Sequence, residues 1–441
     1  MPNKNDIKIS EVINDSKVSR FQIKVLALCC LVAMLDGFDT QSIAFVAPII
    51  SKTFEINSSS LGIVFSAALF GAALGGITFG VIADKYGRKG PLLLSVAIFG
   101  VMTIACGTAD STTELIIYRL LAGIGLGGAF PNIIAIVSEY SPERTRSTFV
   151  VLAIWGFPIG AIAGGIFSGY LIEEFGWQMV FYVGGGMSIL SLFLLVSELP
   201  ESILYLSTVK GTESRIATIL NKLAPDNNFT GSDNFLVSEK PKVKQNYLTL
   251  FNKEYMSRTG IFSIVYFMSL LLSYLLVNWI PSLLSQSGLA IKEAVMGVVV
   301  FNFAGIVGSL VFSRLIDYRG YPIITLAICY FLGAVAVFFV GQIEITYWPI
   351  ILSISVTGFF LIGAQMTFPA VVAEYYPVDI RSTGVGNMQS MGKVGSLIGP
   401  LVGGFLLSAG FSPSQLFEMG VIPTLVCAFS LIVYSRLDRM P

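Results

Sequence analysis

The sequence has no histidine and few charged residues. Only 12% of the 441 residues are charged, roughly half the share of a soluble globular protein, whereas 54% are hydrophobic. The absence of histidine removes the commonest metal ligand and the usual proton shuttle near neutral pH. The 27 basic and 27 acidic residues leave no net charge, so we expect no nucleic acid or other polyanion as a partner. We also expect no metal site and no cofactor.

Cysteine is scarce as well. The five cysteines, Cys29, Cys30, Cys106, Cys329 and Cys427, all lie in apolar stretches without the spacing of metal ligands. We interpret them as buried thiols.

What the sequence has instead is long apolar runs. Uncharged runs of about 20 residues are typical of membrane-spanning helices. We predict twelve spans, at residues 22–50, 60–83, 91–109, 114–139, 148–172, 177–198, 258–284, 293–316, 322–341, 346–372, 382–409 and 414–436. The first is too long for the core of a signal peptide, so we expect it to remain in the mature protein. The predicted fold is an all-α membrane protein with twelve transmembrane helices.

The basic residues predict the orientation of these spans. If the N-terminus is cytoplasmic, 23 of the 27 lysines and arginines fall in the tails and loops of the inner side, and only Lys52 and Lys292 fall outside. Basic loop residues favour the cytoplasmic side of a membrane. We therefore expect both termini in the cytoplasm of a multi-pass plasma-membrane protein, in bacteria the inner membrane.

The chain divides into two similar parts. We predict a six-helix bundle with a cytoplasmic tail at residues 1–198, a cytoplasmic connector at 199–257 and a second six-helix bundle at 258–441. Within the connector, apolar residues at helical spacing between Glu213 and Leu223 predict a short surface helix. The bundles repeat each other: "EYSPERTRST" (139–148) returns as "EYYPVDIRST" (374–383). Two similar six-helix bundles indicate a secondary transporter.

Several motifs resemble one transporter family. "GVIADKYGRKGPLL" (80–93) is similar to the loop signature of the major facilitator superfamily. "LDGFDTQSIAFVAP" (35–48), "SEYSPERTRS" (138–147) and "STGVGNMQSMGKVGSLIGPLVGG" (382–404) resemble its aromatic acid:proton symporters. The resemblance covers essentially the whole chain. It implies import of benzoate-type, hydroxybenzoate-type or related dicarboxylic acids together with protons.

Two acids lie inside the first predicted span. Asp36 and Asp39 are three residues apart, which places both on one side of a helix. An ionised carboxylate at the bilayer centre costs about 2.5–3.5 kcal/mol on insertion scales, so we expect it to be protonated or paired. We predict that this pair carries the coupled proton; which acid titrates stays open, as does a plain hydrogen-bonding role for one of them. The resemblance also links Arg119 to proton coupling, although a snorkelling arginine is an equal alternative.

Lys393 lies near the middle of the eleventh predicted span, without an acidic neighbour in its own helix. A lysine at this depth needs an anion. We predict contact with a substrate carboxylate, and a fixed pair with Asp36 or Asp39 is the alternative. Members of the family often have arginine at this position, which holds a carboxylate with two parallel hydrogen bonds where lysine cannot. Further polar and aromatic residues near predicted mid-span positions complete the predicted substrate site: Asn132, Gln365, Gln389, Tyr274, Trp279 and Asn302.

Acidic and basic residues recur at the inner ends of the predicted spans. We predict that they form a cytoplasmic latch between helix ends, with a solvated basic loop as the alternative. The predicted latch residues are Asp84, Arg88, Asp317, Glu139, Arg146, Glu374 and Arg381.

The predicted function is proton-coupled import of a small organic acid, most simply an aromatic carboxylate, by alternating access. Alternatives are a proton-coupled exporter or antiporter of metabolites or drugs, and a sugar, polyol or dicarboxylate symporter. A sensor or an enzyme is disfavoured, because we find no nucleophile–base set, metal site or output domain. We expect a monomer whose partners are the acid, the proton and the lipid bilayer.

Overall fold

The computed structural model of the chain describes residues 6–225, 227–236, 247–344, 346–377 and 379–437. Within this part of the chain, twelve segments are helical, long and apolar enough to cross a membrane. They are α2 (Arg20–Thr53), α3 (Ser58–Tyr86), α4 (Lys89–Cys106), α5 (Thr112–Tyr140), α6 (Arg146–Phe175), α7 (Gln178–Glu198), α10 (Met256–Gln286), α11 (Ile291–Arg319), α12 (Pro322–Gln342), α13 (Tyr347–Glu374), α14 (Arg381–Ser408) and the pair α15 (Pro413–Met419) with α16 (Val421–Leu437).

The prediction of twelve membrane helices is confirmed, with one internal difference. The last span is broken: α15 ends at Met419, Gly420 follows, and α16 begins at Val421. Pro423 has no backbone N–H, so the carbonyl of Met419 lacks the hydrogen bond that would continue the helix. Hydropathy reports apolar length and does not register this break.

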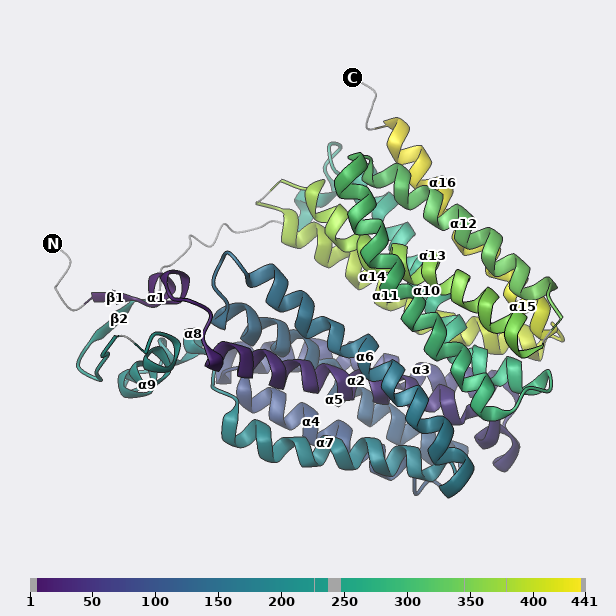
Figure 1. The fold of residues 1–441 in the computed structure, drawn as a ribbon, viewed down its shortest axis with the longest axis horizontal. Helices are drawn as coiled ribbons and strands as arrows, with labels where there is room; N and C mark the ends of the chain where they lie inside the picture. The colour runs from purple at the N-terminus through teal and green to yellow at the C-terminus, as the bar shows by residue number, and fades with distance from the viewer. Residues whose placement is uncertain (1–5, 226, 237–246, 345, 378, 438–441) are drawn as a thin grey trace.

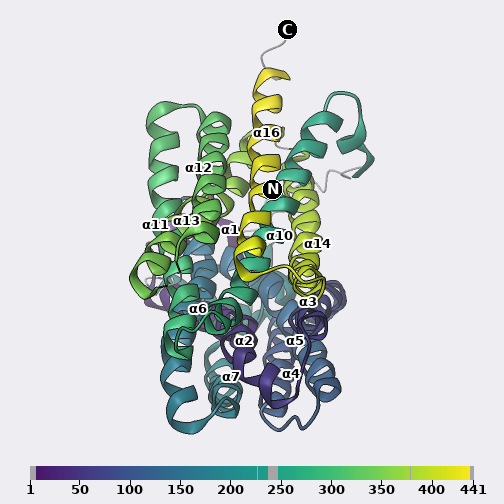
Figure 2. The same ribbon diagram turned by 90° about the vertical axis from the view of Figure 1, so that its right-hand side faces the viewer.

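The helices form two bundles. Helices α2–α7 pack on one another, and α10–α16 do the same. Figure 1 shows the two bundles approaching each other at one end and diverging toward the end where both termini lie. Figure 2, viewed from the side where the bundles meet, shows α10, α12 and α16 on one side of α2, α4 and α7. We call the end with both termini the proximal end and the opposite end the distal end.

One face of α14 contacts the first bundle toward the distal end and is exposed toward the proximal end. Toward the distal end it contacts α3: the backbones of Gly62 and Gly404 meet, and Ser66 Oγ donates to the carbonyl oxygen of Leu397 at 2.9 Å. On the same face, one and two turns closer to the proximal end, Lys393 and Gln389 are exposed. The bundles are therefore closed at the distal end and apart at the proximal end.

A small cap covers the proximal end of the first bundle. It consists of β1 (Asp6–Lys8), α1 (Ile9–Asp15), α8 (Ile203–Leu206), α9 (Glu213–Leu223) and β2 (Asn234–Leu236), with β1 and β2 paired in parallel.

The helix predicted within Glu213–Leu223 is α9. The remaining cap elements, and the short 3₁₀ helix η1 (Tyr247–Phe251) beside α10 and α14, were not predicted from the sequence. Part of the predicted connector, 237–246, lies outside the described residues.

Candidate functional site

The acidic pair lies in the middle of α2, a helix held by a capped first turn and by close packing against α6. Its first turn is held by a capping box, in which Ser19 N donates to Gln22 Oε1 at 2.8 Å and Gln22 N donates to Ser19 Oγ at 3.3 Å. Gln22 Nε2 also donates to the carbonyl oxygen of Tyr140 in α5 at 2.7 Å. Further along, a Cβ on Gly37 would lie 1.9 Å from the carbonyl oxygen of Phe157, so only glycine allows α2 and α6 to approach this closely.

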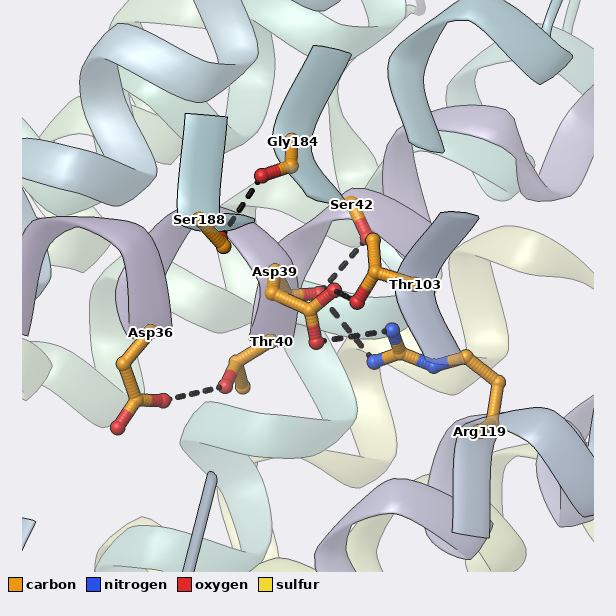
Figure 3. Close-up of polar contacts among 8 residues, drawn as sticks. All are labelled: Asp36, Asp39, Thr40, Ser42, Thr103, Arg119, Gly184 and Ser188. Carbon is orange, nitrogen blue, oxygen red and sulfur yellow. Dashed lines mark hydrogen bonds and ion pairs between the residues drawn. The ribbon is translucent and has the colours of Figure 1, made fainter. Parts of the chain in front are cut away.

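Asp39 points into the first bundle. One Oδ accepts a hydrogen bond from Thr103 of α4, and Asp39 Oδ2 lies 3.1 Å from Arg119 Nη1 of α5 (Figure 3). Arg119 Nη2 also donates to the backbone oxygen of Asp39 at 3.2 Å, and Ser42 Oγ donates to that oxygen at 2.7 Å. Arg119 is 0% exposed, which excludes the snorkelling alternative. The fully buried charges are tolerable because each has a charged partner.

Asp36 points elsewhere, although only three residues separate it from Asp39. At 3.6 residues per turn, the two side chains diverge by about 60° around the helix. Thr40 Oγ1 donates to Asp36 Oδ1 at 3.2 Å, and Figure 3 shows this carboxyl group apart from the Asp39–Arg119 pair. Asp36 interacts electrostatically with Lys393 of α14 and with Tyr274 of α10, both in the second bundle. The sequence placed the acids together, whereas the structure gives them different partners.

Lys393 reaches from α14 toward the first bundle. A Cβ on Gly76 of α3 would lie 3.9 Å from Lys393 Nζ. The lysine is exposed, and Gln389 is exposed one turn away on the same helix. Together with the buried Asp36 of α2 and the partly exposed Tyr274 of α10, these side chains place one cation, one acid, an amide and a phenol on helices that contact the other bundle.

The other predicted substrate residues are placed differently. Gln365 Oε1 accepts a hydrogen bond from Ser273 within the second bundle. Asn132 is fully buried in the first bundle, where Nδ2 donates to the carbonyl oxygen of Gly128 at 2.8 Å. Its Oδ1 has no hydrogen-bond partner among the described residues.

Trp279 and Asn302 lie where the bundles touch. Trp279 is 0% exposed; its Nε1 donates to the carbonyl oxygen of Pro400 at 3.0 Å, and its ring meets Phe65 of the first bundle edge-on at 5.2 Å. Asn302 Nδ2 donates to Gln41 Oε1 across the contact at 3.0 Å. We call the contacts between the distal halves of the bundles the distal seal. At its rim, Lys292 Nζ lies 3.8 Å from Glu173 Oε2.

The comparisons with known proteins agree with this architecture. The sequence model of the Major Facilitator Superfamily matches residues 29–372 and 262–441. The chain belongs to the major facilitator superfamily. It is 34% identical to the gallate transporter of Pseudomonas putida over 99% of this chain and 97% of the relative. It is 33% identical to the 4-hydroxybenzoate transporter PcaK of Acinetobacter baylyi, over 98% of this chain and 95% of the relative.

A crystal structure of a D-xylose-proton symporter shares the fold, with a TM-score of 0.71, 17% identity and coverage of 93% of this chain and 97% of that one. The chain is thus a superfamily member related to aromatic acid transporters, a multi-pass protein of the bacterial plasma membrane and not an enzyme.

The predicted latch residues of this superfamily member lie at the proximal ends of the helices. Arg88 Nη2 lies 2.9 Å from Asp84 Oδ1, and Glu139 accepts a hydrogen bond from Ser202. Arg146 Nε donates to the carbonyl oxygen of Ser138 at 3.1 Å.

In the second bundle, Arg381 Nε donates to the carbonyl oxygen of Tyr376 at 3.4 Å, Asp317 lies in the last turn of α11, and Glu374 ends α13. All of these contacts lie within one bundle, as expected where the proximal ends are apart. A latch that joins the two bundles stays a prediction.

Several residues of the site carried no usable signal in the sequence. Thr103 and Gln41 are single polar residues in apolar runs, and nothing local indicates that one contacts Asp39 and the other Asn302. Glu201 Oε1 accepts hydrogen bonds from the backbone N–H groups of Arg88 and Lys89 at 2.7 and 3.0 Å, and so caps α4 from 112 residues away. The nearest signal was the position of Glu201 in "LPES" (199–202), directly after the sixth span.

Proposed function

We propose that this protein imports an aromatic carboxylate together with a proton by alternating access. The observation that carries the proposal is that Asp36 of the first bundle and Lys393 of the second both lie near the middle of membrane helices, with Lys393 Nζ beside Gly76 of the first bundle. A lysine at this depth needs an anion, and an acid there needs a cation or a proton. The names of the relatives, transporters of gallate and 4-hydroxybenzoate, support an aromatic carboxylate as the anion.

The bias of basic residues toward one side supports a cytoplasmic location for the proximal end. On this assignment the structure represents the inward-open state, and the distal seal faces the outside. In the outward-open state, substrate and proton would enter from the distal end, and the proximal helix ends would meet at the predicted latch.

The arrangement supports a simple coupling step. While Asp36 is ionised, it attracts Lys393 across the gap. When Asp36 takes up a proton, this attraction is lost, and Lys393 is free to hold the carboxylate of the substrate. Substrate binding and protonation then favour each other. Protonation of Asp36 removes the anion that competes with the substrate for Lys393, and a bound substrate carboxylate neutralises the lysine that would otherwise stabilise ionised Asp36. Asp39 and Arg119 form a second charged pair, buried within the first bundle, and Thr103 donates a hydrogen bond to Asp39. This pair is a further candidate for proton coupling.

The test uses purified protein in liposomes and labelled 4-hydroxybenzoate. We expect an inward proton gradient to drive accumulation in the wild type. Lys393→Gln should lower uptake at least tenfold. Asp36→Asn should abolish accumulation but retain exchange between labelled and unlabelled acid, because the neutral amide resembles the protonated acid.

Normal accumulation in Asp36→Asn would contradict the role of Asp36. A wild type whose inward flux ignores external acidification would contradict symport and favour the exporter alternative.

A further inference from the structure

A cavity lies between the cap and the proximal end of the first bundle, where Figure 1 shows α1 and α8. Its volume is about 210 Å³, and its walls come from α1, the last turn of α5, the first residue of α6, and α8. We call it the cap cavity. Asp36, Asp39 and Lys393 do not line it, so it is separate from the site between the bundles. An apolar cavity of about 150 Å³ in another protein holds benzene, so this one admits a ring or a short branched chain.

The polar side chains of the cap cavity have donors to spare. Arg146 Nε donates to the carbonyl oxygen of Ser138 at 3.1 Å, and Nη1 lies 3.9 Å from Glu143 Oε1, whereas Nη2 has no partner among the described residues. Asn14 Oδ1 accepts a hydrogen bond from Glu143 N at 2.8 Å. In the described part of the chain, Asn14 Nδ2 and Ser10 Oγ have no hydrogen-bond partner. A guanidinium group, an amide and a hydroxyl group are thus available for a ligand.

The acid in the cavity wall, in contrast, has partners of its own. Glu139 accepts a hydrogen bond from Ser202, and Arg88 acts electrostatically on the same carboxylate. The first turn of α6 adds positive partial charge, since this helix begins at Arg146 and the preceding Thr145 makes no side-chain capping bond. Unpaired donors, one of them charged, at the positive end of a helix favour a ligand that supplies acceptor atoms and a negative charge.

The rest of the wall is apolar. Ile9, Ile13 and Ile203 line the cavity, and each is buried. An inorganic anion gains nothing from such a surface, whereas a hydrocarbon group that covers it gains roughly 25 cal/mol for each Å² removed from water. The cavity therefore suits a carboxylate with an apolar body.

We propose that the cap cavity binds a small carboxylate with an apolar body and that the bound anion slows transport. This inference rests on the proposed function, which assigns the proximal end to the cytoplasm, where imported acid accumulates. Arg146 is one of the predicted latch residues, and a bound carboxylate occupies its guanidinium group. The proximal ends then close less readily, and the inward-open state is favoured. Accumulated acid thus limits its own import at a site outside the transport path.

The first experiment measures binding of benzoate to the purified full-length protein by calorimetry. Lys393→Gln is the background, because it weakens the site between the bundles. We expect one benzoate site in this background. Ser10→Phe fills the cap cavity and Arg146→Gln removes its positive charge, so each should raise the Kd for benzoate at least tenfold. Two variants in different elements keep the test valid if one does not fold.

Arg215→Gln is the matched control. Arg215 is an exposed arginine of α9 in the same cap, and it does not line the cavity. The substitution removes the same charge as Arg146→Gln and should leave the Kd for benzoate unchanged.

The second experiment measures transport into liposomes loaded with benzoate. Internal benzoate should lower the initial rate of uptake of labelled 4-hydroxybenzoate in the wild type. Ser10→Phe should need at least fivefold more internal benzoate for the same inhibition, because the cavity is filled. Its uptake into empty liposomes should equal that of the wild type, since Ser10 lies outside the transport site.

The outcomes separate the inference from the proposed function. Absence of benzoate binding in the Lys393→Gln background, or an equal Kd in the cavity variants and the control, would overturn the cap cavity as a site. Equal inhibition of the wild type and Ser10→Phe would show that internal benzoate acts only at the transport site, and would overturn the regulation. If the wild type carries no acid, the proposed function fails, and the calorimetry still decides whether the cavity binds a carboxylate.

Discussion

The distal seal depends on glycines that let the two bundles touch backbone to backbone. A Cβ on Gly404 would lie 2.5 Å from the carbonyl oxygen of Ser58 in the other bundle. This is below any normal contact distance, and the obstructing atom is backbone, so it cannot move without its helix. We therefore predict that Gly404→Ala shifts the protein toward the state with separated distal ends.

The size of the shift follows from the cost of overpacking. An extra carbon in a well-packed contact costs about 1–3 kcal/mol. Because the clash exists only while the seal is closed, this cost acts on the equilibrium between the two states, and the ratio of open to closed distal ends should rise roughly 5- to 150-fold.

The assay measures the distance across the distal end. Spin labels on Lys52 of the first bundle and Ser408 of the second, both exposed, report it by pulsed electron resonance in a cysteine-free background. Gly386→Ala is the control: it makes the same substitution in α14, where no atom lies within 4 Å of the new Cβ. We expect a longer distance population in Gly404→Ala only. Identical distance distributions in the two variants would refute the reasoning that this glycine contact holds the seal closed.

Two further predictions concern the first bundle. Asp39→Ala leaves Arg119 charged and fully buried without its partner, so we expect a loss of stability of about 3–5 kcal/mol, measured by denaturant unfolding in detergent; an unchanged unfolding curve would show that Arg119 is not held by Asp39. Arg144 donates to the carbonyl oxygens of Asn14 and Ser16 at the end of α1. Arg144→Ala should therefore release the N-terminal segment of the cap and speed its cleavage by protease several-fold, and equal cleavage rates would speak against this anchor.

The sequence by itself determined the membrane helices. Lipid offers no hydrogen bonds to the backbone, so an apolar run of sufficient length has to be helical. The sequence also singled out four charged residues inside these runs: Asp36, Asp39, Arg119 and Lys393. A charge in lipid is unfavourable unless it is paired or neutralised, so each of these residues indicated a partner or a function. The cap helix α9 was also predictable, since its apolar residues follow the helical period.

Only the tertiary structure decided which of these groups meet. Asp39 and Arg119 are 80 residues apart, and the periodicity of α2 does not indicate that Asp39 pairs with Arg119 while Asp36 accepts a hydrogen bond from Thr40 of its own helix. The structure places the ring of Trp279 in the distal seal, against Phe65 of α3 and the carbonyl oxygen of Pro400 of α14, and its contact with substrate stays a prediction. Hydrophobicity is a local property of the chain and fixes each helix. The pairing of side chains depends on how the helices are arranged, and that arrangement follows from contacts between residues far apart in the sequence.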